Sequence, residues 1–318
     1  MLLHAALNGR IRFRAVGPGD SAVYFSMYRS CLRNAEYFGF GDEASMAKHL
    51  DKKRTSDVGG AWLILDGDQP LGLVEFGFVE EWIGITRFGL LNSTDAVLAE
   101  VVMSISRSGM EGHQSIRAIF EEQYEHGFRA AGFRLLGRRI NRALDLDAMS
   151  IEVEGGQASP SSLSAASAET VAACLLSAYS GGVDVAIGLY TPTTMDAFLA
   201  YATDVLDGGE GTLVQDGSFV IMREEKVAGL VIVADGLCLP DLQKRAVVVE
   251  FAVDPDHQAK GFGRSLLRRS CAALKALGYA EIVLQYTQGN AKAERLYADL
   301  GFQEMGQRVL RSELVPIR

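Results

Sequence analysis

The alternation of apolar and polar positions in the last third of the chain predicts a strand, a loop, a helix and a second strand. Residues 246–253 are almost all apolar or β-branched, which is typical of a central strand buried on both faces. After Gly263, apolar residues recur at helical spacing as far as Leu274, and Gly278 lies where such a helix would end. An apolar strand follows at residues 282–285, so the order of elements favours an α/β arrangement.

The loop between that strand and that helix has the residues that an anion-binding turn needs. Gln258, Gly261 and Gly263 lie just before the helix, whose first N–H groups are unpaired and whose dipole is positive at this end. Glycine lets an anion approach the backbone closely, so we expect a cradle for a diphosphate. The P-loop motif is absent, and Leu266 replaces the third glycine of the Rossmann fingerprint. An ordinary turn that uses its glycines for packing is the alternative.

These residues resemble the signature of the GNAT superfamily of N-acetyltransferases. That signature is Gln/Arg-x-x-Gly-x-Gly/Ala after a strand ending in Val-x-Pro, and here it is Val253-Asp-Pro255 followed by Gln258 to Gly263. A second block of the family is matched by Asn290, Tyr297 and Leu300-Gly-Phe302. The resemblance is dense over residues 246–302 and extends faintly back to about residue 148.

The resemblance implies an α/β fold, with a central mixed sheet of α+β type flanked by helices, and acetyl-CoA as cosubstrate without a metal. In the family, CoA is held by the end of the strand and by the loop. The corresponding residues are Phe251, Ala252, Val253, Gln258, Ala259, Lys260, Gly261, Phe262, Gly263, Arg264 and Asn290. Helices are predicted at residues 168–179 and 194–206, and in this superfamily the two helices at this place line the acceptor pocket.

Tyr297 is the best candidate for a catalytic acid. Asn290 is a good N-cap for the last helix, and Tyr297 follows seven residues later on nearly the same helical face. In the family a tyrosine hydroxyl at this place donates a proton to the CoA thiolate. A core tyrosine packed beside Leu296 and Leu300 is the alternative.

Glu250 is the candidate base. It places a carboxylate in a strand that is otherwise apolar, and burial of such a group would raise its pKa toward neutrality. A base is useful because an acceptor ammonium is mostly charged at neutral pH. A glutamate at a strand edge, or one facing Arg245, is an equal alternative, and many relatives use ordered water instead.

A faint internal repeat predicts two copies of one architecture. Hairpin-like segments at residues 63–74 and 220–231 keep a glycine at one register, and Gly132-Phe133 matches Gly301-Phe302. First strands are expected at residues 11–14 and 151–154. We therefore expect domains 1–147 and 148–318, with chance similarity as the alternative.

The first copy lacks the features on which catalysis would depend. It has no counterpart of the anion loop, and Phe128 stands where the second copy has Tyr297. Domain 1–147 is therefore expected to be degenerate and non-catalytic, packing against domain 148–318 or shaping its acceptor site. Domain 148–318 is expected to bind acetyl-CoA.

Composition narrows the partners and the compartment. The 318 residues are 48% hydrophobic and 22% charged, with a net charge of −9, which is enough for two globular domains and argues against general nucleic-acid binding. The four cysteines form no C-x-x-C, and the five histidines show no metal-ligand spacing. No apolar run reaches transmembrane length, and the start lacks the pattern of a signal peptide. We expect a cytoplasmic monomer or homodimer with no membrane partner.

The predicted function is transfer of an acetyl group from acetyl-CoA to a primary amine of a small molecule, directly and without a covalent enzyme intermediate. Some protein N-terminal acetyltransferases have a glutamate at the position of Gln285, which disfavours a peptide N-terminus as acceptor. The alternatives are a non-catalytic acyl-CoA sensor or scaffold, and an enzyme resembling mycothiol synthase or acting on an antibiotic amine. The identity of the acceptor and the preferred acyl chain are not set by these residues.

Overall fold

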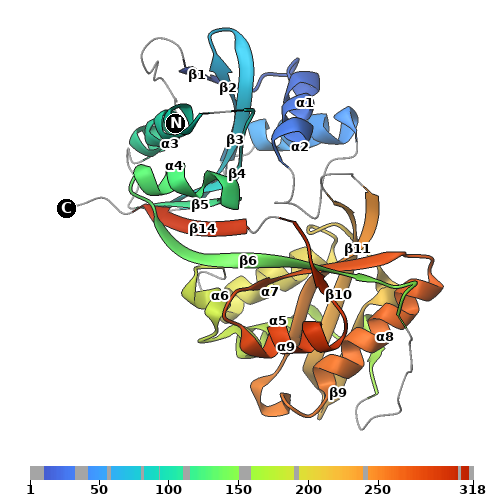
Figure 1. Cartoon of the computed structure of the whole chain (residues 1–318). Helices are drawn as coiled ribbons and strands as arrows, with labels where there is room; N and C mark the ends of the chain where they lie inside the picture. Colours follow the sequence, from blue (N-terminus) through green and yellow to red (C-terminus); the bar gives the residue numbers. More distant parts are fainter. Residues whose placement is uncertain are drawn as a thin grey trace. The chain divides into compact units, whose positions relative to one another are not determined.

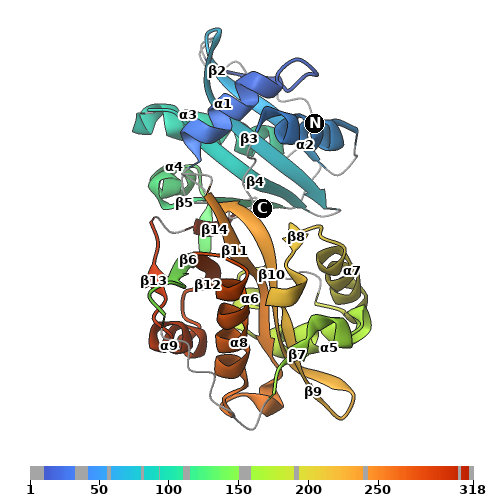
Figure 2. The same ribbon diagram turned by 90° about the vertical axis from the view of Figure 1, so that its right-hand side faces the viewer.

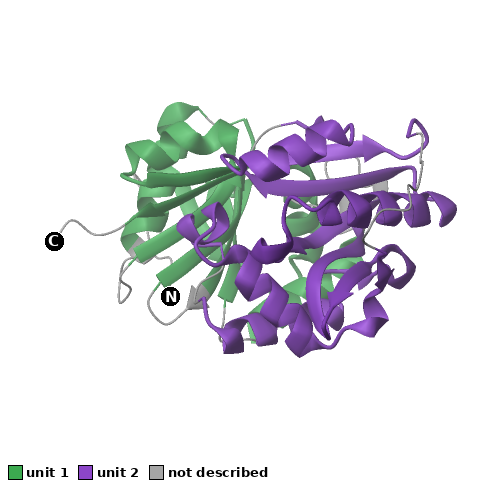
Figure 3. Ribbon diagram, turned by 90° about the horizontal axis from the view of Figure 1, so that it is seen from below, with its two compact units in different colours: residues 1–139, 239–242, 307–318 green, residues 140–238, 243–306 purple. Residues whose placement is uncertain are grey.

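The structure is a computed structural model in which the chain forms two compact units. It describes residues 11–32, 42–55, 59–79, 82–92, 94–109, 115–149, 159–189, 193–238, 243–306 and 309–314. Unit 1 contains residues 1–139, 239–242 and 307–318, and unit 2 contains residues 140–238 and 243–306 (Figure 3). The division therefore does not follow a single cut of the chain. The first strand expected at residues 151–154 lies outside the described residues.

Unit 1 is a mixed sheet with helices on both sides (Figure 1). Its strands follow the order β1-β2-β3-β4-β5-β14-β6, in which β4 and β5 are parallel and the other neighbours antiparallel. The strands are β1 (Ile11–Ala15), β2 (Gly59–Asp66), β3 (Gln69–Val79), β4 (Trp82–Leu90), β5 (Ser115–Glu121), β14 (Val309–Leu314) and the first half of β6 (Arg134–Asp145). The helices are α1 (Ser21–Cys31), α2 (Glu43–Thr55), α3 (Asp95–Gly109) and α4 (Glu125–Ala130).

Unit 2 repeats this plan. Its strands follow the order β6-β12-β11-β10-β9-β7, with β11 and β12 parallel, while β13 pairs with β6 and β8 with β10. The strands are β7 (Ser161–Ser162), β8 (Thr212–Leu213), β9 (Phe219–Arg223), β10 (Lys226–Cys238), β11 (Gln243–Val253), β12 (Glu281–Thr287) and β13 (Gln303–Glu304). The helices are α5 (Ala168–Tyr179), α6 (Val183–Ala186), α7 (Met195–Leu206), α8 (Phe262–Ala276) and α9 (Ala291–Asp299).

The elements predicted from periodicity are confirmed in unit 2. Leu267 and Leu274 of α8 are fully buried, and Gly278 after its end has a φ of +86°. The helix α5 has the predicted bounds, and α7 begins one residue later than expected because Thr194 is its N-cap. No described helix is long and apolar enough to cross a membrane.

Two apolar cores lie on opposite faces of the sheet in unit 2 (Figure 2). The helices α8 and α9 bury Leu266 and Tyr297 on one face. The helices α5 and α7 bury Val171 and Phe198 on the other. A side chain of β10 or β11 therefore reaches one pair of helices or the other, according to the face on which it lies.

The last strand of each copy completes the sheet of the other unit. The strand β14, red in Figure 1, lies between β5 and β6 in unit 1. The second half of β6, from Ile140 onward, lies between β12 and β13 in unit 2. The strand β14 has thus been exchanged, whereas β6 takes part in both sheets, and neither sheet is formed by one contiguous segment.

This exchange predicts that a substitution near the C-terminus weakens unit 1. Leu310 of β14 is fully buried in the core of unit 1, so Leu310→Ala should lower the free energy of unfolding of that unit by about 2–5 kcal/mol. Urea denaturation followed by tryptophan fluorescence measures this, because Trp62 and Trp82 both lie in unit 1. Leu277→Ala, at a leucine that is 48% exposed, is the matched control. Equal losses in the two variants would contradict the burial of β14.

Candidate active site

The N-terminus of α8 is the candidate anion site. Its N-cap, Gly261, has a φ of +82°, which only glycine adopts without strain, and no side chain caps this end among the described residues. The first turn contains no acidic residue. A Cβ placed on Gly261 would meet nothing within 4 Å, so the space beside this turn is open, and the first N–H groups of a helix have no partner within the helix.

Gly263 has a different role in the same turn. A Cβ there would lie 3.1 Å from the Phe251 ring and 3.2 Å from the side chain of Leu296. This glycine therefore lets the start of α8 pack tightly on β11 and α9. The sequence left two alternatives for this loop, an anion-binding turn and a turn that uses its glycines for packing. Gly261 has the conformation of the first, and Gly263 has the close contacts of the second.

Side chains of the loop hold its shape. Gln258 donates from Nε2 to the main-chain oxygen of Val253 at 3.0 Å, and its Oε1 accepts from Lys292 Nζ at 2.7 Å. His257 stacks on Phe262 with ring centroids 5.5 Å apart. Gln258 thus fixes the loop onto the end of β11.

Two further cations of the loop bind neighbouring segments. Lys260 donates to the main-chain oxygen of Asp256 at 2.6 Å, and Arg264 pairs with Asp299 of α9 at 2.8 Å. Both sides of the Arg264 pair are well exposed, so the pair adds little stability. Ala259 adopts a left-handed φ of +59°. These contacts leave the first turn of α8 uncovered.

The ladder between β11 and β12 ends early. Ala246 pairs with Ile282 and Val247 with Val283, and no later pair exists in the described sheet, although β11 continues to Val253. Beyond Val247 and Val283 the two strands are therefore not paired in the described sheet. A molecule with amides could pair there as an added strand.

A β-bulge determines which face Glu250 occupies. Ile232 lies opposite Glu250 and Val233 lies opposite Val248, so Val249 has no partner on β10. One extra residue in a strand turns the following side chains to the other face. Val248 packs in the core beneath α8, whereas Glu250 lies toward α5 and α7.

The carboxylate of Glu250 is held by two tyrosines. Tyr179, at the end of α5, donates to Oε2 at 2.6 Å, and Tyr201 of α7 donates to Oε1 at 2.6 Å. Glu250 itself is only 2% exposed. Arg245, the partner considered from the sequence, forms an ion pair with Glu281.

Tyr297 lies in the core on the other face of the sheet. It is 5% exposed, and its ring lies 6.1 Å from Phe251, 5.6 Å from Tyr286 and 5.8 Å from Phe302. Asn290 caps α9, since its Oδ1 accepts from the N–H of Ala293 at 3.2 Å. The predicted cap is confirmed, and the ring of Tyr297 lies beside the strand that ends in the anion loop.

All the residues predicted for the site lie in unit 2, on β11, the loop, α8 and α9 (Figure 2). The tyrosines that hold Glu250 were missed. Both lie on helices predicted to line the acceptor pocket, but no spacing in the sequence connects Tyr179 or Tyr201 to Glu250. Gln285, which the sequence analysis used to disfavour a peptide acceptor, donates from Nε2 to Asn141 Oδ1 at 2.7 Å.

The counterpart of Glu250 in unit 1 has the opposite charge. Glu75 of β3 lies opposite Arg87 of β4, and the register shifts directly afterwards, as it does at Ile232 and Glu250 in unit 2. Arg87 therefore occupies the position of Glu250. The shared bulge shows that the two units repeat one another in backbone detail.

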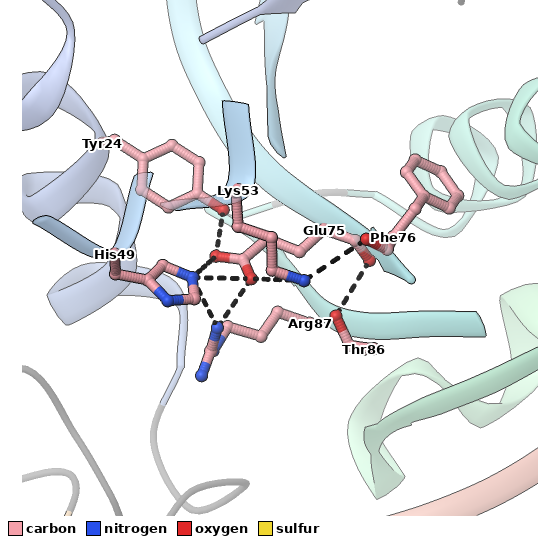
Figure 4. Close-up of polar contacts among 7 residues, drawn as sticks. All are labelled: Tyr24, His49, Lys53, Glu75, Phe76, Thr86 and Arg87. Carbon is pink, nitrogen blue, oxygen red and sulfur yellow. Dashed lines mark hydrogen bonds and ion pairs between the residues drawn. The ribbon is translucent and has the colours of Figure 1, made fainter. Parts of the chain in front are cut away.

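Arg87 belongs to a cluster of polar side chains around Glu75 (Figure 4). Glu75 has no exposed surface and accepts from Arg87 Nη1 at 2.6 Å and from Tyr24 Oη at 2.9 Å. His49 Nε2 lies 3.1 Å from Glu75 Oε2, and Lys53 Nζ lies 3.9 Å away. Burial alone would raise the pKa of Glu75, but the three basic groups outweigh it and lower the pKa to about 2.

The end of the corresponding strand in unit 1 is bonded by a tyrosine side chain. The pairing of Gly72 with Leu90 matches that of Gly229 with Val253, so Leu90 corresponds to the end of β11. The hydroxyl of Tyr124 accepts from the N–H of Leu90 at 3.0 Å and lies 3.2 Å from its carbonyl oxygen. The tyrosine hydroxyl thus bonds both backbone groups of Leu90, whereas in unit 2 the carbonyl of the equivalent Val253 accepts from Gln258.

Comparison with known proteins agrees with this geometry. The sequence model of the acetyltransferase (GNAT) family matches residues 187–302, which include α7 to α9. Human N-acetyltransferase 8B is 32% identical over 121 residues, covering 36% of this chain and 52% of that protein. The [ribosomal protein bS18]-alanine N-acetyltransferase of Escherichia coli K12 is 42% identical over 59 residues, covering 19% of this chain and 40% of that protein. The chain thus spans about half or less of the length of these relatives.

The fold of the whole chain is that of a tandem GNAT protein. A tandem GNAT protein from the clavulanic acid biosynthesis pathway superposes with a TM-score of 0.63 at 13% identity, covering 96% of this chain and 98% of that one. Residues 187–302, which lie in unit 2, thus match the GNAT acetyltransferase family in sequence, and the structural likeness shows the fold. The family implies acetyl-CoA as cosubstrate.

The cluster around Glu75 predicts a loss of stability in acid. Because the folded pKa of about 2 lies below the ordinary value of 4.5, the carboxylate stabilises unit 1 above about pH 4.5, and this contribution falls as the pH drops toward 2. Glu75→Gln should cost about 3 kcal/mol or more at neutral pH and flatten the acid dependence of the urea midpoint. The exposed Glu43→Gln in the same unit is the control. An unchanged acid slope in Glu75→Gln would contradict the assignment.

Proposed function

We propose that the protein transfers an acetyl group from acetyl-CoA to the primary amine of a small molecule, and that unit 2 carries out the reaction. The observation that carries this proposal is the uncapped N-terminus of α8 beside the open end of the β11–β12 ladder. One site offers donors for a diphosphate and the other offers backbone groups for the amides of pantetheine. The two lie next to one another along the chain, as the two parts of CoA do.

Main-chain groups would make most of the contacts with CoA. The turn from Gln258 to Arg264 would bind the diphosphate through its N–H groups, with Gly261 giving access. Residues 251–253 would pair with the pantetheine arm. Asn290 would contribute from the start of α9, and Lys260 would add positive charge at the rim.

The chemistry requires a neutral amine and a protonated leaving group. Acetyl-CoA supplies an activated acyl group, and the amine lone pair forms the C–N bond as the C–S bond breaks. Glu250 would take a proton from the acceptor ammonium, and Tyr297 would donate one to the departing sulfur. The nitrogen gives up two protons in all, one retained on the thiol and one released, so no covalent intermediate with the protein is needed.

Gln285 supports a small amine, rather than a peptide N-terminus, as the proposed acceptor. The Escherichia coli relative is named for acetylation of a ribosomal protein, but here the amide of Gln285 is bonded to Asn141 and cannot accept a proton as a glutamate would. We therefore place small amines before peptide N-termini. Thiol release measured with polyamines, with amino sugars and with a peptide that has an N-terminal alanine separates these classes. Absence of release with all three would support a sensor role instead.

Unit 1 is proposed to be non-catalytic. Tyr124 occupies the backbone of Leu90, Arg87 replaces the candidate base, and Phe128 stands where unit 2 has Tyr297. Each change removes one requirement of the reaction. The role of unit 1 would then be structural, through its pairing with β14.

Gly261→Asp should abolish binding of acetyl-CoA. Aspartate tolerates a positive φ better than most residues, so the helix should form, while the added carboxylate repels the diphosphate at close range. Calorimetric titration with acetyl-CoA measures the loss. Gly278→Asp, at the other end of α8 with a φ of +86° and equally open space, is the matched control. Normal binding by Gly261→Asp would remove this site from the proposal.

Tyr297→Phe should lower kcat by about 100-fold while leaving the Kd for acetyl-CoA within about twofold, because only the acidic proton is lost. The ring packing with Phe251 and Phe302 is retained, which keeps the fold intact. Thiol release and calorimetry on the same samples give the two numbers. Wild-type turnover in this variant would assign Tyr297 to the core alone.

A further inference from the structure

The proposed base is almost completely enclosed. Glu250 is 2% exposed, whereas Tyr179 and Tyr201, which donate to its two oxygens, are both half-buried. A proton that leaves an acceptor amine must therefore reach a carboxylate with almost no surface of its own. A phenol hydroxyl can accept one proton while it gives up another, so it can bridge this gap.

The two tyrosines are placed differently. The hydroxyl of Tyr179 also lies 3.4 Å from the main-chain oxygen of Phe251, on the strand proposed to hold pantetheine. Tyr201 holds the other carboxylate oxygen from the middle of α7. Tyr179 is thus beside the proposed acyl position, and Tyr201 is set to fix the orientation of Glu250.

The segment after Tyr179 spans the opening of the ladder. It passes Gly181, with a φ of +72°, and enters α6, where Asp184 accepts from the hydroxyl of Thr287. Thr287 is the last residue of β12, and Glu250 lies on β11. Contacts at both strands therefore fix this segment where an acceptor must meet the acyl group.

We propose, building on the acetyltransferase function above, that Tyr179 is a catalytic proton relay and Tyr201 a positioning residue, and that the acceptor enters as a protonated primary amine. The ammonium N–H passes its proton to the Tyr179 oxygen as the Tyr179 hydroxyl proton passes to Glu250 Oε2. Tyr179 is unchanged, Glu250 becomes the neutral acid, and the amine becomes the free nucleophile. Glu250 then releases its proton to solvent by the reverse path after the product leaves.

Three further described groups near Glu250 are unsuited to take this proton. Cys174 of α5 is 3% exposed, and burial together with the charges of Asp254 and Glu250 raises the pKa of its thiol to about 12. Asp254 is engaged by Ser177 at 2.7 Å. Opposite Glu250, β10 presents the apolar Ile232. Tyr179 and Tyr201 are therefore the hydroxyl donors from α5 and α7 that the relay uses.

The first experiment tests how the tyrosines hold the carboxylate and needs no acceptor. Protein labelled with ¹³C at glutamate carboxyls is titrated by NMR, and the Glu250 signal is assigned by its loss in Glu250→Gln. Tyr179→Phe and Tyr201→Phe should each raise the titration midpoint of Glu250 by about one pH unit, because each removes a hydrogen bond that favours the charged form. Tyr279→Phe, which removes a phenol donor to Asp235 elsewhere in unit 2, is the matched control. An unmoved midpoint in both test variants overturns the positioning role.

The second experiment tests the relay with the amine that gives the fastest thiol release. Tyr179→Phe should lower kcat by about 100-fold even at alkaline pH, above the raised midpoint of Glu250, while the KM for acetyl-CoA is unchanged. Tyr201→Phe should instead move the acidic limb of the pH profile to higher pH and recover turnover in alkali. A kcat for Tyr179→Phe equal to that of Tyr279→Phe overturns the relay. Absence of acetyl-CoA binding by the wild type overturns the proposed function and the relay together, and the NMR titration then still decides the role of Tyr201.

Discussion

One extra residue in β11 is the constraint on which the site in unit 2 depends. With strict alternation, Ala246, Val248 and Glu250 would share one face, and the carboxylate would be buried beneath α8 among apolar side chains. Because Val249 has no partner on β10, Glu250 turns toward α5 and α7, where phenol hydroxyls satisfy both of its oxygens. The bulge thus places the carboxylate on the face of the sheet opposite Tyr297, where two hydrogen bonds offset the cost of burying its charge.

The same bulge carries a different side chain in unit 1. Arg87 replaces Glu250, and a buried Glu75 with its basic neighbours completes a cluster of charges. The backbone of Leu90 is likewise bonded by Tyr124. The same strand irregularity thus carries a carboxylate held by two phenols in one copy and a buried cluster of charges in the other, so the two copies keep one architecture with different polar interiors.

Much of unit 2 could be predicted from its sequence, because its signals are local. The apolar run of β11, the glycine loop and the stripe of α8 each follow from short-range periodicity, and Asn290 follows from its cap chemistry. The bonds from Tyr179 and Tyr201 could not be predicted, since they join residues 71 and 49 positions apart across two helices. The bulge was missed because a run of β-branched residues shows no alternation to interrupt. Strand exchange could not be predicted either, because the residues of β6 and β14 favour a strand without indicating which sheet the strand joins.

The exchanged strands also bear on how the chain can be made. A ribosome delivers residues in order, and the sheet of unit 1 has a vacancy between β5 and β6 until Val309–Leu314 have left the exit tunnel. The sheet of unit 1 is therefore incomplete, with unpaired main-chain groups at β5 and β6, while most of the second copy is synthesised. A cut of the gene near its midpoint would remove β14 from the sheet of unit 1 and leave β5 without its partner on that side.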